Sequence, residues 1–261
     1  MMQLAFDIGN SALKMGLYNG SKLVRSERAG LSSSETTALI ENVVTRETVA
    51  WASIASVVPN AAHHVVQVLE SHGVPIQMVH HAVRLPFRIA YQTPETLGAD
   101  RIAAAAGAWL RHGHPGRRGV VAVDAGTAVT CEVVTKDGTY LGGTIAPGPA
   151  LMQRALNTET AQLPDVPLDV PETPIGRTTR EAIQAGVLLG FIDSVQGMLR
   201  RISEQLGESP AVVVTGGWGP SLRGHLERID AFEPNLVLEG ARAIGEMNYE
   251  GDLSSASQKR R

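Results

Sequence analysis

The sequence predicts an α/β fold built from two duplicated lobes with a cleft between them. Two stretches, residues 4–18 and 120–134, share the pattern of a strand, an acid–glycine turn and a second strand. Strands also alternate with helical segments, which indicates a sheet packed by crossover helices. A Gly/Pro-rich stretch at residues 112–119 separates the two halves. We therefore expect lobes at residues 1–115 and 116–249, followed by a disordered tail at residues 250–261.

The elements of the first half follow from hydrophobic spacing and turn signals. Asn19-Gly20 is a strong hairpin signal. A helix begins after Ser34, which we expect to be its cap. Thr93-Pro94-Glu95 has the form of a helix start, although Gly98 could delay the first turn. The predicted elements are the hairpin over residues 4–18, strands over 22–24, 49–58 and 75–79, and helices over 35–45, 61–71 and up to 111.

The second half repeats this order of elements. A turn at Lys136-Asp137-Gly138 joins two strands, and a helix follows Pro149. A proline-rich connector covers residues 163–174. The apolar residues of the helix over 180–206 cover most of its surface, so we expect a central helix or one that also forms a subunit interface. The strand over 211–215 ends at Gly216-Gly217 before a helical segment, as the strand over 49–58 precedes its helix.

Composition limits the classes of function. The 261 residues are 43% hydrophobic and 19% charged, with a formal net charge of −3, enough apolar material for one large or two modest cores. The sequence lacks the stripe of basic residues that would indicate nucleic-acid binding. No apolar run reaches the roughly 20 residues of a membrane span, and the N-terminus lacks the basic region of a signal peptide. The single cysteine, Cys131, excludes an internal disulfide. We expect a cytoplasmic protein without nucleic-acid or membrane partners.

The two acid–glycine turns have the residue types of a phosphate-binding site. Asp7 aligns with Asp124, and Asn10 aligns with Thr127. If the turns face each other across a cleft, their backbone N–H groups can bind phosphate oxygens while the acids bind cations. Gly216-Gly217 would permit flat contact with a base or ribose. From the residues alone, ordinary hairpin turns and close strand–helix packing stay open as alternatives.

Five motifs, in this order, resemble those of type III pantothenate kinases. The resemblance covers the chain up to Asn248 and places it in the acetate kinase and actin-like superfamily, with two actin-like (ribonuclease H-like) lobes. This sequence departs from the family at Ser11, usually Thr, at Thr178, usually Asn, and at Trp218, usually a smaller residue. The motifs are Asp7-Ile8-Gly9-Asn10-Ser11, Gly98-Ala99-Asp100-Arg101, Asp124-Ala125-Gly126-Thr127-Ala128, Gly142-Gly143-Thr144-Ile145-Ala146-Pro147-Gly148 and Thr215-Gly216-Gly217.

The resemblance implies ATP-dependent phosphorylation of pantothenate to 4'-phosphopantothenate, the first step of coenzyme A biosynthesis. It also implies Mg²⁺, a monovalent cation (K⁺ or NH₄⁺) and a homodimer with the active site near the interface. By motif matching, Asp100 is the general base, Asp124 binds the monovalent cation and Asp7 binds Mg²⁺ through water. The implied pantothenate contacts are Tyr91, Gly98, Ala99, Asp100, Arg101 and Thr179. The implied ATP contacts are Asp7, Ile8, Gly9, Asn10, Ser11, Ala12, Leu13, Lys14, Thr127, Gly216 and Gly217.

Two other functions stay open beside this one. The chain could phosphorylate another small hydroxyl substrate, in which case the match at Gly98–Arg101 is coincidental. Independently of the substrate, Asp100-Arg101 could be a structural ion pair on a helix surface. The chain could also bind ATP as a regulator without a small substrate, as heat-shock chaperones of the same superfamily do. The histidine pairs His63-His64 and His80-His81 lack metal-site spacing, and we assign them no function.

Overall fold

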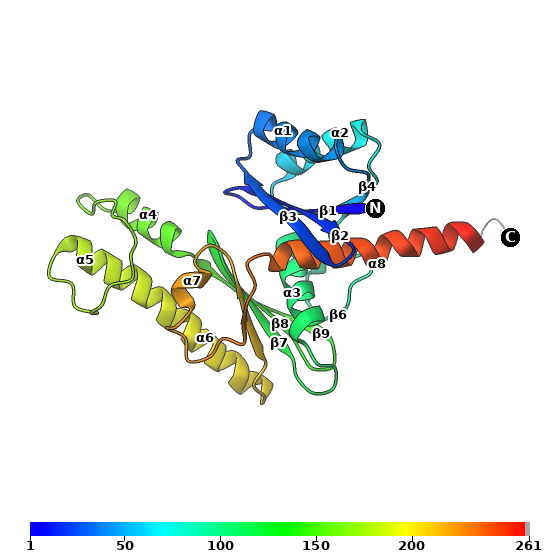
Figure 1. The fold of residues 1–261 in the computed structure, drawn as a ribbon. Helices are drawn as coiled ribbons and strands as arrows, with labels where there is room; N and C mark the ends of the chain where they lie inside the picture. The colour runs from blue at the N-terminus through cyan, green and yellow to red at the C-terminus, as the bar shows by residue number, and fades with distance from the viewer. Residues whose placement is uncertain (259–261) are drawn as a thin grey trace. The chain divides into compact units, whose positions relative to one another are not determined.

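The chain packs as two compact units. The computed structural model describes the backbone of residues 1–258 and the side chains of residues 1–249. Unit 1 comprises residues 1–111, 138–141 and the C-terminal segment from residue 235, and unit 2 comprises residues 112–137 and 142–234. Unit 1 contains a five-stranded mixed β-sheet, and unit 2 contains most of a six-stranded one, whose β6 (Arg88–Ile89) and first residues of β9 (Thr139–Pro147) belong to unit 1 (Figure 1).

The sheet of unit 1 has the strand order β3-β2-β1-β4-β5. β1 pairs antiparallel with β2 and parallel with β4. Leu4, Ala5 and Phe6 are all fully buried, as expected for a central strand covered on both faces. The strands are β1 (Met2–Ile8), β2 (Leu13–Asn19), β3 (Lys22–Ala29), β4 (Val49–Ser56) and β5 (Ile76–Met78).

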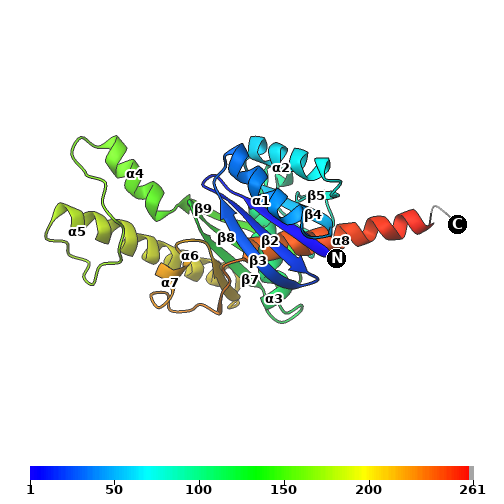
Figure 2. The same ribbon diagram turned by 45° about the horizontal axis from the view of Figure 1, so that its top comes forward.

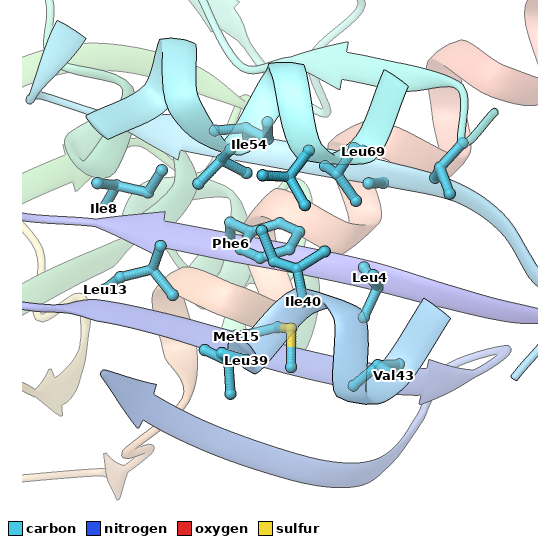
Figure 3. Packing of buried hydrophobic residues seen from close by; sticks show 14 of the residues in the cluster. Leu4, Phe6, Ile8, Leu13, Met15, Leu39, Ile40, Val43, Ile54 and Leu69 are labelled. Atoms are coloured by element: carbon cyan, nitrogen blue, oxygen red, sulfur yellow. The ribbon is translucent and has the colours of Figure 1, made fainter. Parts of the chain in front are cut away.

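Helices α1 (Ser33–Val44) and α2 (Pro59–Ser71) lie side by side on one face of this sheet (Figure 2). The cap of α1 is Ser32 and not Ser34 as predicted, because the Ser32 hydroxyl is the one that accepts the N–H of Glu35, at 3.4 Å. Figure 3 shows the core beneath the two helices. Its labelled members are Leu4, Phe6, Ile8, Leu13, Met15, Leu39, Ile40, Val43, Ile54 and Leu69.

The opposite face is covered by α8 (Leu236–Gln258), which contacts β1 and β4. Trp51 and Ser53 alternate with the core residues Ala52 and Ile54 along β4, so they point toward α8. A Cβ on Gly245 would lie 2.5 Å from the Trp51 ring, so the missing side chain allows this close approach.

The sequence analysis predicted no helix where α8 lies, and it assigned residues 250–261, which include the end of α8, to a disordered tail. The backbone is helical to Gln258, and residues 259–261 lie outside the described part of the chain. Glycines lower helix propensity, so α8 depends on its packing against unit 1. The predicted lobe over residues 116–249 differs from unit 2 because α8 packs in unit 1.

Helix α3 (Ala99–His112) completes unit 1. It begins at Ala99, and a short 3₁₀ turn, η1 (Pro94–Thr96), precedes it. Gly98 therefore does delay the helix, as the sequence allowed. A Cβ on Gly240 of α8 would lie 1.8 Å from the carbonyl oxygen of Ala103, so α3 and α8 are packed backbone to backbone.

The six-stranded sheet repeats the topology of the first. Its order is β11-β10-β7-β8-β9-β6, and β7 pairs antiparallel with β8 and parallel with β10, as β1 does with β2 and β4. The duplication predicted from the two acid–glycine turns is thus confirmed in the strand order. The strands are β6 (Arg88–Ile89), β7 (Val120–Ala125), β8 (Ala128–Val134), β9 (Thr139–Pro147), β10 (Ala211–Thr215) and β11 (Ala231–Phe232).

The helices of unit 2 are α4 (Pro149–Glu159), α5 (Thr179–Gln184), the π-helix η2 (Ala185–Leu189), α6 (Gly190–Leu206) and α7 (Gly219–Leu222). Together α5, η2 and α6 form the predicted long helix, and α6 packs Phe191, Val195 and Leu199 in the core of this unit. By length and composition this helix could cross a membrane, contrary to expectation. A single helix of this kind is weak evidence for a membrane span, because helices that pack in a protein core pass the same test.

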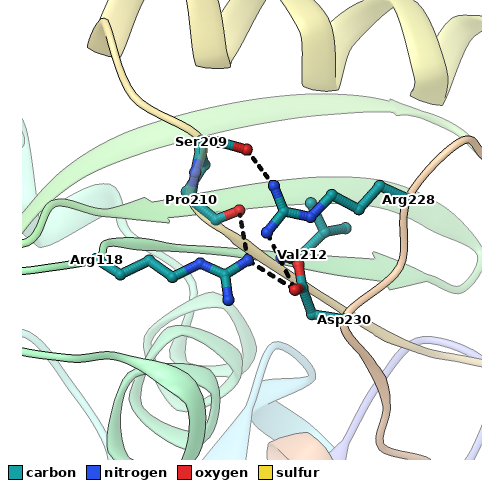
Figure 4. Close-up of polar contacts among 6 residues, drawn as sticks. All are labelled: Arg118, Ser209, Pro210, Val212, Arg228 and Asp230. Atoms are coloured by element: carbon teal, nitrogen blue, oxygen red, sulfur yellow. Dashed lines mark hydrogen bonds and ion pairs between the residues drawn. The ribbon is translucent and has the colours of Figure 1, made fainter.

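Two arginines and one aspartate fix the strands that lead to Gly216 (Figure 4). The Asp230 carboxylate accepts hydrogen bonds from Arg118 at 2.6 Å and from Arg228 at 3.1 Å. Its other oxygen accepts the backbone N–H of Val212, on β10, at 2.8 Å. This cluster ties the segment before β11 to the start of β10.

Candidate active site

The turn between β1 and β2 brings Asp7 and Lys14 together. The antiparallel register places these two residues opposite each other, and Lys14 Nζ lies 3.7 Å from Asp7 Oδ2. The N–H of Gly9 donates to the carbonyl of Ala12 at 3.1 Å, which closes the turn. Asn10 is exposed at its tip. The turn thus presents backbone groups and one amine at the end of the sheet.

Two residues of this predicted ATP-binding stretch belong to the core. Ile8 and Leu13 are fully buried beneath α1 and α2. Their side chains therefore cannot face a ligand, and only their backbone is left for one. Ser11, where the family usually has Thr, is exposed beside Asn10.

Asp100 lies in the first turn of α3, where the helix dipole favours a negative charge. Its Oδ1 accepts the N–H of Arg101 at 2.8 Å. Burial raises the pKa of the Asp100 carboxyl above its ordinary value of 3.8, and this hydrogen bond together with the charge of Arg101 offsets part of the rise. The carboxylate therefore binds a proton more readily than an exposed aspartate does.

Gly98 leaves the space in which this carboxylate lies. A Cβ added at Gly98 would lie 2.6 Å from Asp100 Oδ1, well inside van der Waals contact. The same Cβ would meet Val57 at an ordinary 3.5 Å. The missing side chain of Gly98 therefore leaves room for the Asp100 carboxylate. Ala99, the first residue of α3, lies between the two in the chain.

A second carboxylate of unit 1 is electrostatically coupled to Asp100. Burial raises the pKa of Asp7, the charge of Lys14 lowers it, and the charge of Asp100 raises it further. Arg101 is only 8% exposed, and its guanidinium carbon lies 5.8 Å from the centre of the Tyr91 ring. Unit 1 thus brings together Asp7 and Lys14, which the resemblance implies as ATP contacts, with Asp100, Arg101 and Tyr91, which it implies as the base and pantothenate contacts.

In unit 2 the corresponding turn follows Asp124 at the end of β7. The N–H of Gly126 donates to the carbonyl of Ala128 at 3.0 Å. Gly216 has a φ of +89°, and a Cβ there would lie 2.5 Å from Asp124 Oδ1. Because of this close approach, Gly216 contacts the Asp124 turn directly. Trp218 also contacts this turn, since its N–H donates to the carbonyl of Ala125 at 2.9 Å.

Gly148, the last residue of the fourth motif, lies against the Asp124 turn. Its N–H donates to the carbonyl of Thr127 at 2.9 Å, and a Cβ there would lie 2.3 Å from the Gly126 carbonyl oxygen. It therefore supports the turn on which Thr127 is exposed. The signal that could have revealed it is Gly148-Pro149 at the start of a helix, since α4 has Gly148 as its N-cap.

Thr179 lies at the start of α5 beside an apolar cavity. Thr178, which replaces the usual Asn, caps this helix: its hydroxyl accepts the N–H of Glu181 at 3.2 Å, and the Glu181 carboxylate accepts the N–H of Thr178. Thr178 therefore caps α5, a position that asparagine also suits. Thr179 lines a cavity of about 660 Å³ together with apolar residues of α4, α5 and η2, among them Leu151, Met152 and Ile183.

The described residues contain no group of three or more His, Cys, Asp or Glu side chains that could hold a metal ion. Asp7 and Asp124 offer single carboxylates, which are hard oxygen ligands. The Asp7 carboxylate fits Mg²⁺, which proteins often hold by one or two carboxylates together with the phosphates of a substrate.

Comparison with known proteins identifies the family that the sequence motifs resemble. A family model described as type III pantothenate kinase matches residues 3–201. The type III pantothenate kinase of Desulfosudis oleivorans is 36% identical over 94% of this chain and 98% of its own length. That of Acidothermus cellulolyticus is 34% identical over 95% of this chain and 99% of its own.

Solved structures share the fold at low sequence identity. A Campylobacter jejuni protein assigned to the Baf family of transcriptional activators aligns with a TM-score of 0.60 at 19% identity, over 96% of this chain and all of that one. A hexokinase of the ROK type from Thermus thermophilus aligns with a TM-score of 0.51 at 14% identity, over 94% of this chain and 98% of that one. These likenesses support the two-lobe actin-like fold expected from the sequence.

Proposed function

The chain belongs to the type III pantothenate kinase family, and we propose that its Asp100 is the base that receives the proton of the attacking pantothenate hydroxyl. The protein transfers a phosphate from ATP to pantothenate, the first step of coenzyme A biosynthesis. The observation that carries the proposal is the placement of Asp100. Its carboxylate lies in the space left by Gly98, at the start of α3, with Arg101 next to it.

Asp100 acts by orienting the hydroxyl and by receiving its proton late. An aliphatic alcohol is too weak an acid to ionise before attack, and phosphoryl transfer proceeds through a loose transition state. A carboxylate whose pKa is raised by burial is a better proton acceptor than an exposed one. Tyr91 and Arg101 bind pantothenate beside Asp100. Gly98 and Ala99 contribute backbone to the same binding site. The resemblance adds Thr179, at the start of α5, as a further pantothenate contact.

The two acid–glycine turns bind ATP. The turn from Asp7 to Lys14 offers backbone N–H groups and the Lys14 amine to phosphate oxygens, and Thr127 offers a hydroxyl. Gly216 and Gly217 contact the nucleoside, with Trp218 as the nearest large side chain. Asp7 would hold Mg²⁺ through water, and Asp124 would hold a monovalent cation, K⁺ or NH₄⁺. When bound, these cations offset the charge of the phosphates.

We include a homodimer in this proposal. Two features of unit 2 favour a dimer. One is the apolar cavity beside Thr179. The other is that large hydrophobic side chains of unit 2 are exposed, such as Ile145 at 64% and Ile175 at 77%. Sedimentation of the purified protein should give twice the chain mass, and a monomer at micromolar concentration would contradict the dimer. We also propose a cytoplasmic location, because the reaction consumes intracellular ATP.

An ADP-release assay tests the function. Purified protein with ATP, Mg²⁺ and K⁺ should release ADP only when pantothenate is present, together with a phosphorylated product. Asp100→Asn is the matched control, since it keeps the shape of the side chain and removes the base. No pantothenate-dependent ADP under K⁺ or NH₄⁺ would refute the assignment, and equal release with other small alcohols would favour a different substrate.

A further inference from the structure

An aromatic cluster in unit 1 adjoins the proposed pantothenate site without belonging to it. Tyr140, on β9, is fully buried. Its ring stacks on Phe87, with the centroids 5.6 Å apart and the planes 23° from parallel. It also contacts Tyr91, with the centroids 6.3 Å apart and the planes tilted by 57°. Tyr140 therefore touches two residues of the segment 87–91.

The backbone fixes the same segment to the same strand. β6 pairs parallel with the start of β9, and Ile89 lies opposite Tyr140. The N–H of Ala90 donates to the carbonyl of Tyr140 at 2.9 Å, and the N–H of Arg88 donates to the carbonyl of Gly138 at 2.9 Å. These bonds end one residue before Tyr91, whose ring is then contacted by the ring of Tyr140 and by the Arg101 guanidinium.

Tyr91 in turn contacts the N-terminal end of α3, where Asp100 and Arg101 lie. Its ring lies against the Arg101 guanidinium at 5.8 Å, and the N–H of Arg101 donates to the Asp100 carboxylate. Tyr91 itself is partly exposed, and Gln92 and Thr93 after it are exposed. A partly exposed ring at the start of an exposed stretch is ordered by the buried groups that contact it, which here are Tyr140 and Arg101.

We propose that Tyr140 is a positioning residue of the kinase: its buried ring holds Tyr91 in the orientation that binds pantothenate beside Arg101. Tyr140 touches no substrate. The inference rests on the proposed role of Tyr91 and adds to it the residue that pre-orders the side chain. A ring that is already oriented loses less conformational freedom when pantothenate binds, so Tyr140 contributes to pantothenate affinity and leaves ATP affinity unchanged.

Steady-state kinetics of Tyr140→Leu test the inference. We expect the KM for pantothenate to rise about tenfold, while the KM for ATP stays within about twofold of the wild type. Tyr140→Phe keeps the ring and should restore a pantothenate KM close to that of the wild type. An unchanged pantothenate KM in Tyr140→Leu, or an equal rise in the KM for ATP, would overturn the proposal.

Tyr18→Leu is the matched control. Tyr18 is equally buried in unit 1, on β2, with Arg242 of α8 over its ring at 5.8 Å, and no contact described for it reaches Tyr91. Its replacement should lower the denaturation midpoint in urea and leave the KM for pantothenate unchanged. A rise in that KM equal to the rise in Tyr140→Leu would mean that any buried cavity in unit 1 has this effect, which also overturns the inference.

Tyr91→Ala separates this inference from the proposed function. If Tyr91→Ala leaves the pantothenate KM unchanged, the role of Tyr91 itself is wrong. If Tyr91→Ala raises it and Tyr140→Leu does not, only the inference about Tyr140 fails. The double variant should be no worse than Tyr91→Ala, since both changes remove one interaction. If Tyr140→Leu does not fold, Tyr140→Met takes its place, because a flexible chain fills the site without the ring.

Discussion

Gly98→Ala isolates the placement of the Asp100 carboxylate from its chemistry. The new methyl group would lie 2.6 Å from Asp100 Oδ1, and ordinary contact begins at 3.4 Å. The carboxylate must therefore move by about 0.8 Å. The other neighbours of the methyl group, Val57 at 3.5 Å and Arg101 at 3.7 Å, already lie at ordinary distances and need not move. A displacement of about 1 Å of a catalytic group lowers turnover by up to about 10²-fold, so we expect kcat to fall roughly 10- to 100-fold.

The free energy of unfolding of Gly98→Ala should not fall together with its kcat. Gly98 is absent from the glycines with positive φ, so alanine fits its backbone. Replacing glycine at such a position stabilises a protein by about 0.4–1 kcal/mol through the unfolded state, which offsets the cost of moving one carboxylate. We therefore expect an unchanged melting temperature together with a reduced kcat, measured by thermal unfolding and by ADP release.

Gly197→Ala is the control for this prediction. Gly197 lies within α6 with no atom within 4 Å of the new methyl group, so its replacement should add up to about 1 kcal/mol of stability and leave kcat unchanged. Wild-type kcat in a folded Gly98→Ala would refute the reasoning, because the carboxylate would then not need its present position. A parallel loss of stability and kcat would mean that Gly98 supports the fold.

Three further changes test the rest of the site. Asp100→Asn should keep ATP binding and lose turnover by about 10²-fold or more. Because burial raises the folded-state pKa of Asp100, its ionisation costs stability at neutral pH, so this variant should melt higher there. That gain should disappear below the ordinary pKa of 3.8, where the carboxyl is protonated in both states, and a lower melting temperature at neutral pH would contradict it. Asp124→Ala should weaken ATP binding and abolish the response to K⁺, and an unchanged response would place the cation elsewhere. Gly216→Ala should cost more than about 1 kcal/mol in urea unfolding, because its φ is +89° and its methyl group would lie 2.5 Å from Asp124, whereas wild-type stability would show that the turn adapts.

The duplication was accessible from the sequence because its signal is local. Each acid–glycine turn lies between two strands that are close in the chain, and the strand orders β3-β2-β1-β4-β5 and β9-β8-β7-β10-β11 confirm the correspondence. The motif around Asp100 was visible for the same reason. Gly98, Asp100 and Arg101 are neighbours in the chain, and the start of α3 needs no distant contact to bring them together.

Spatial relations between distant segments required the tertiary structure. α8 escaped prediction because its glycines weaken the helical signal, and only contact with β4 and α3 explains Gly240 and Gly245. The coupling of Asp7 to Asp100 joins residues far apart in the chain.

The sequence by itself therefore determined the fold class, the order of the elements and the family, all of which depend on spacing along the chain. The tertiary structure decided that α8 packs with unit 1, that Gly98 makes room for Asp100, and that Tyr140 lies against Tyr91. The physical reason is that side-chain packing depends on distances through space, and residues remote in sequence reach those distances only when the chain has folded.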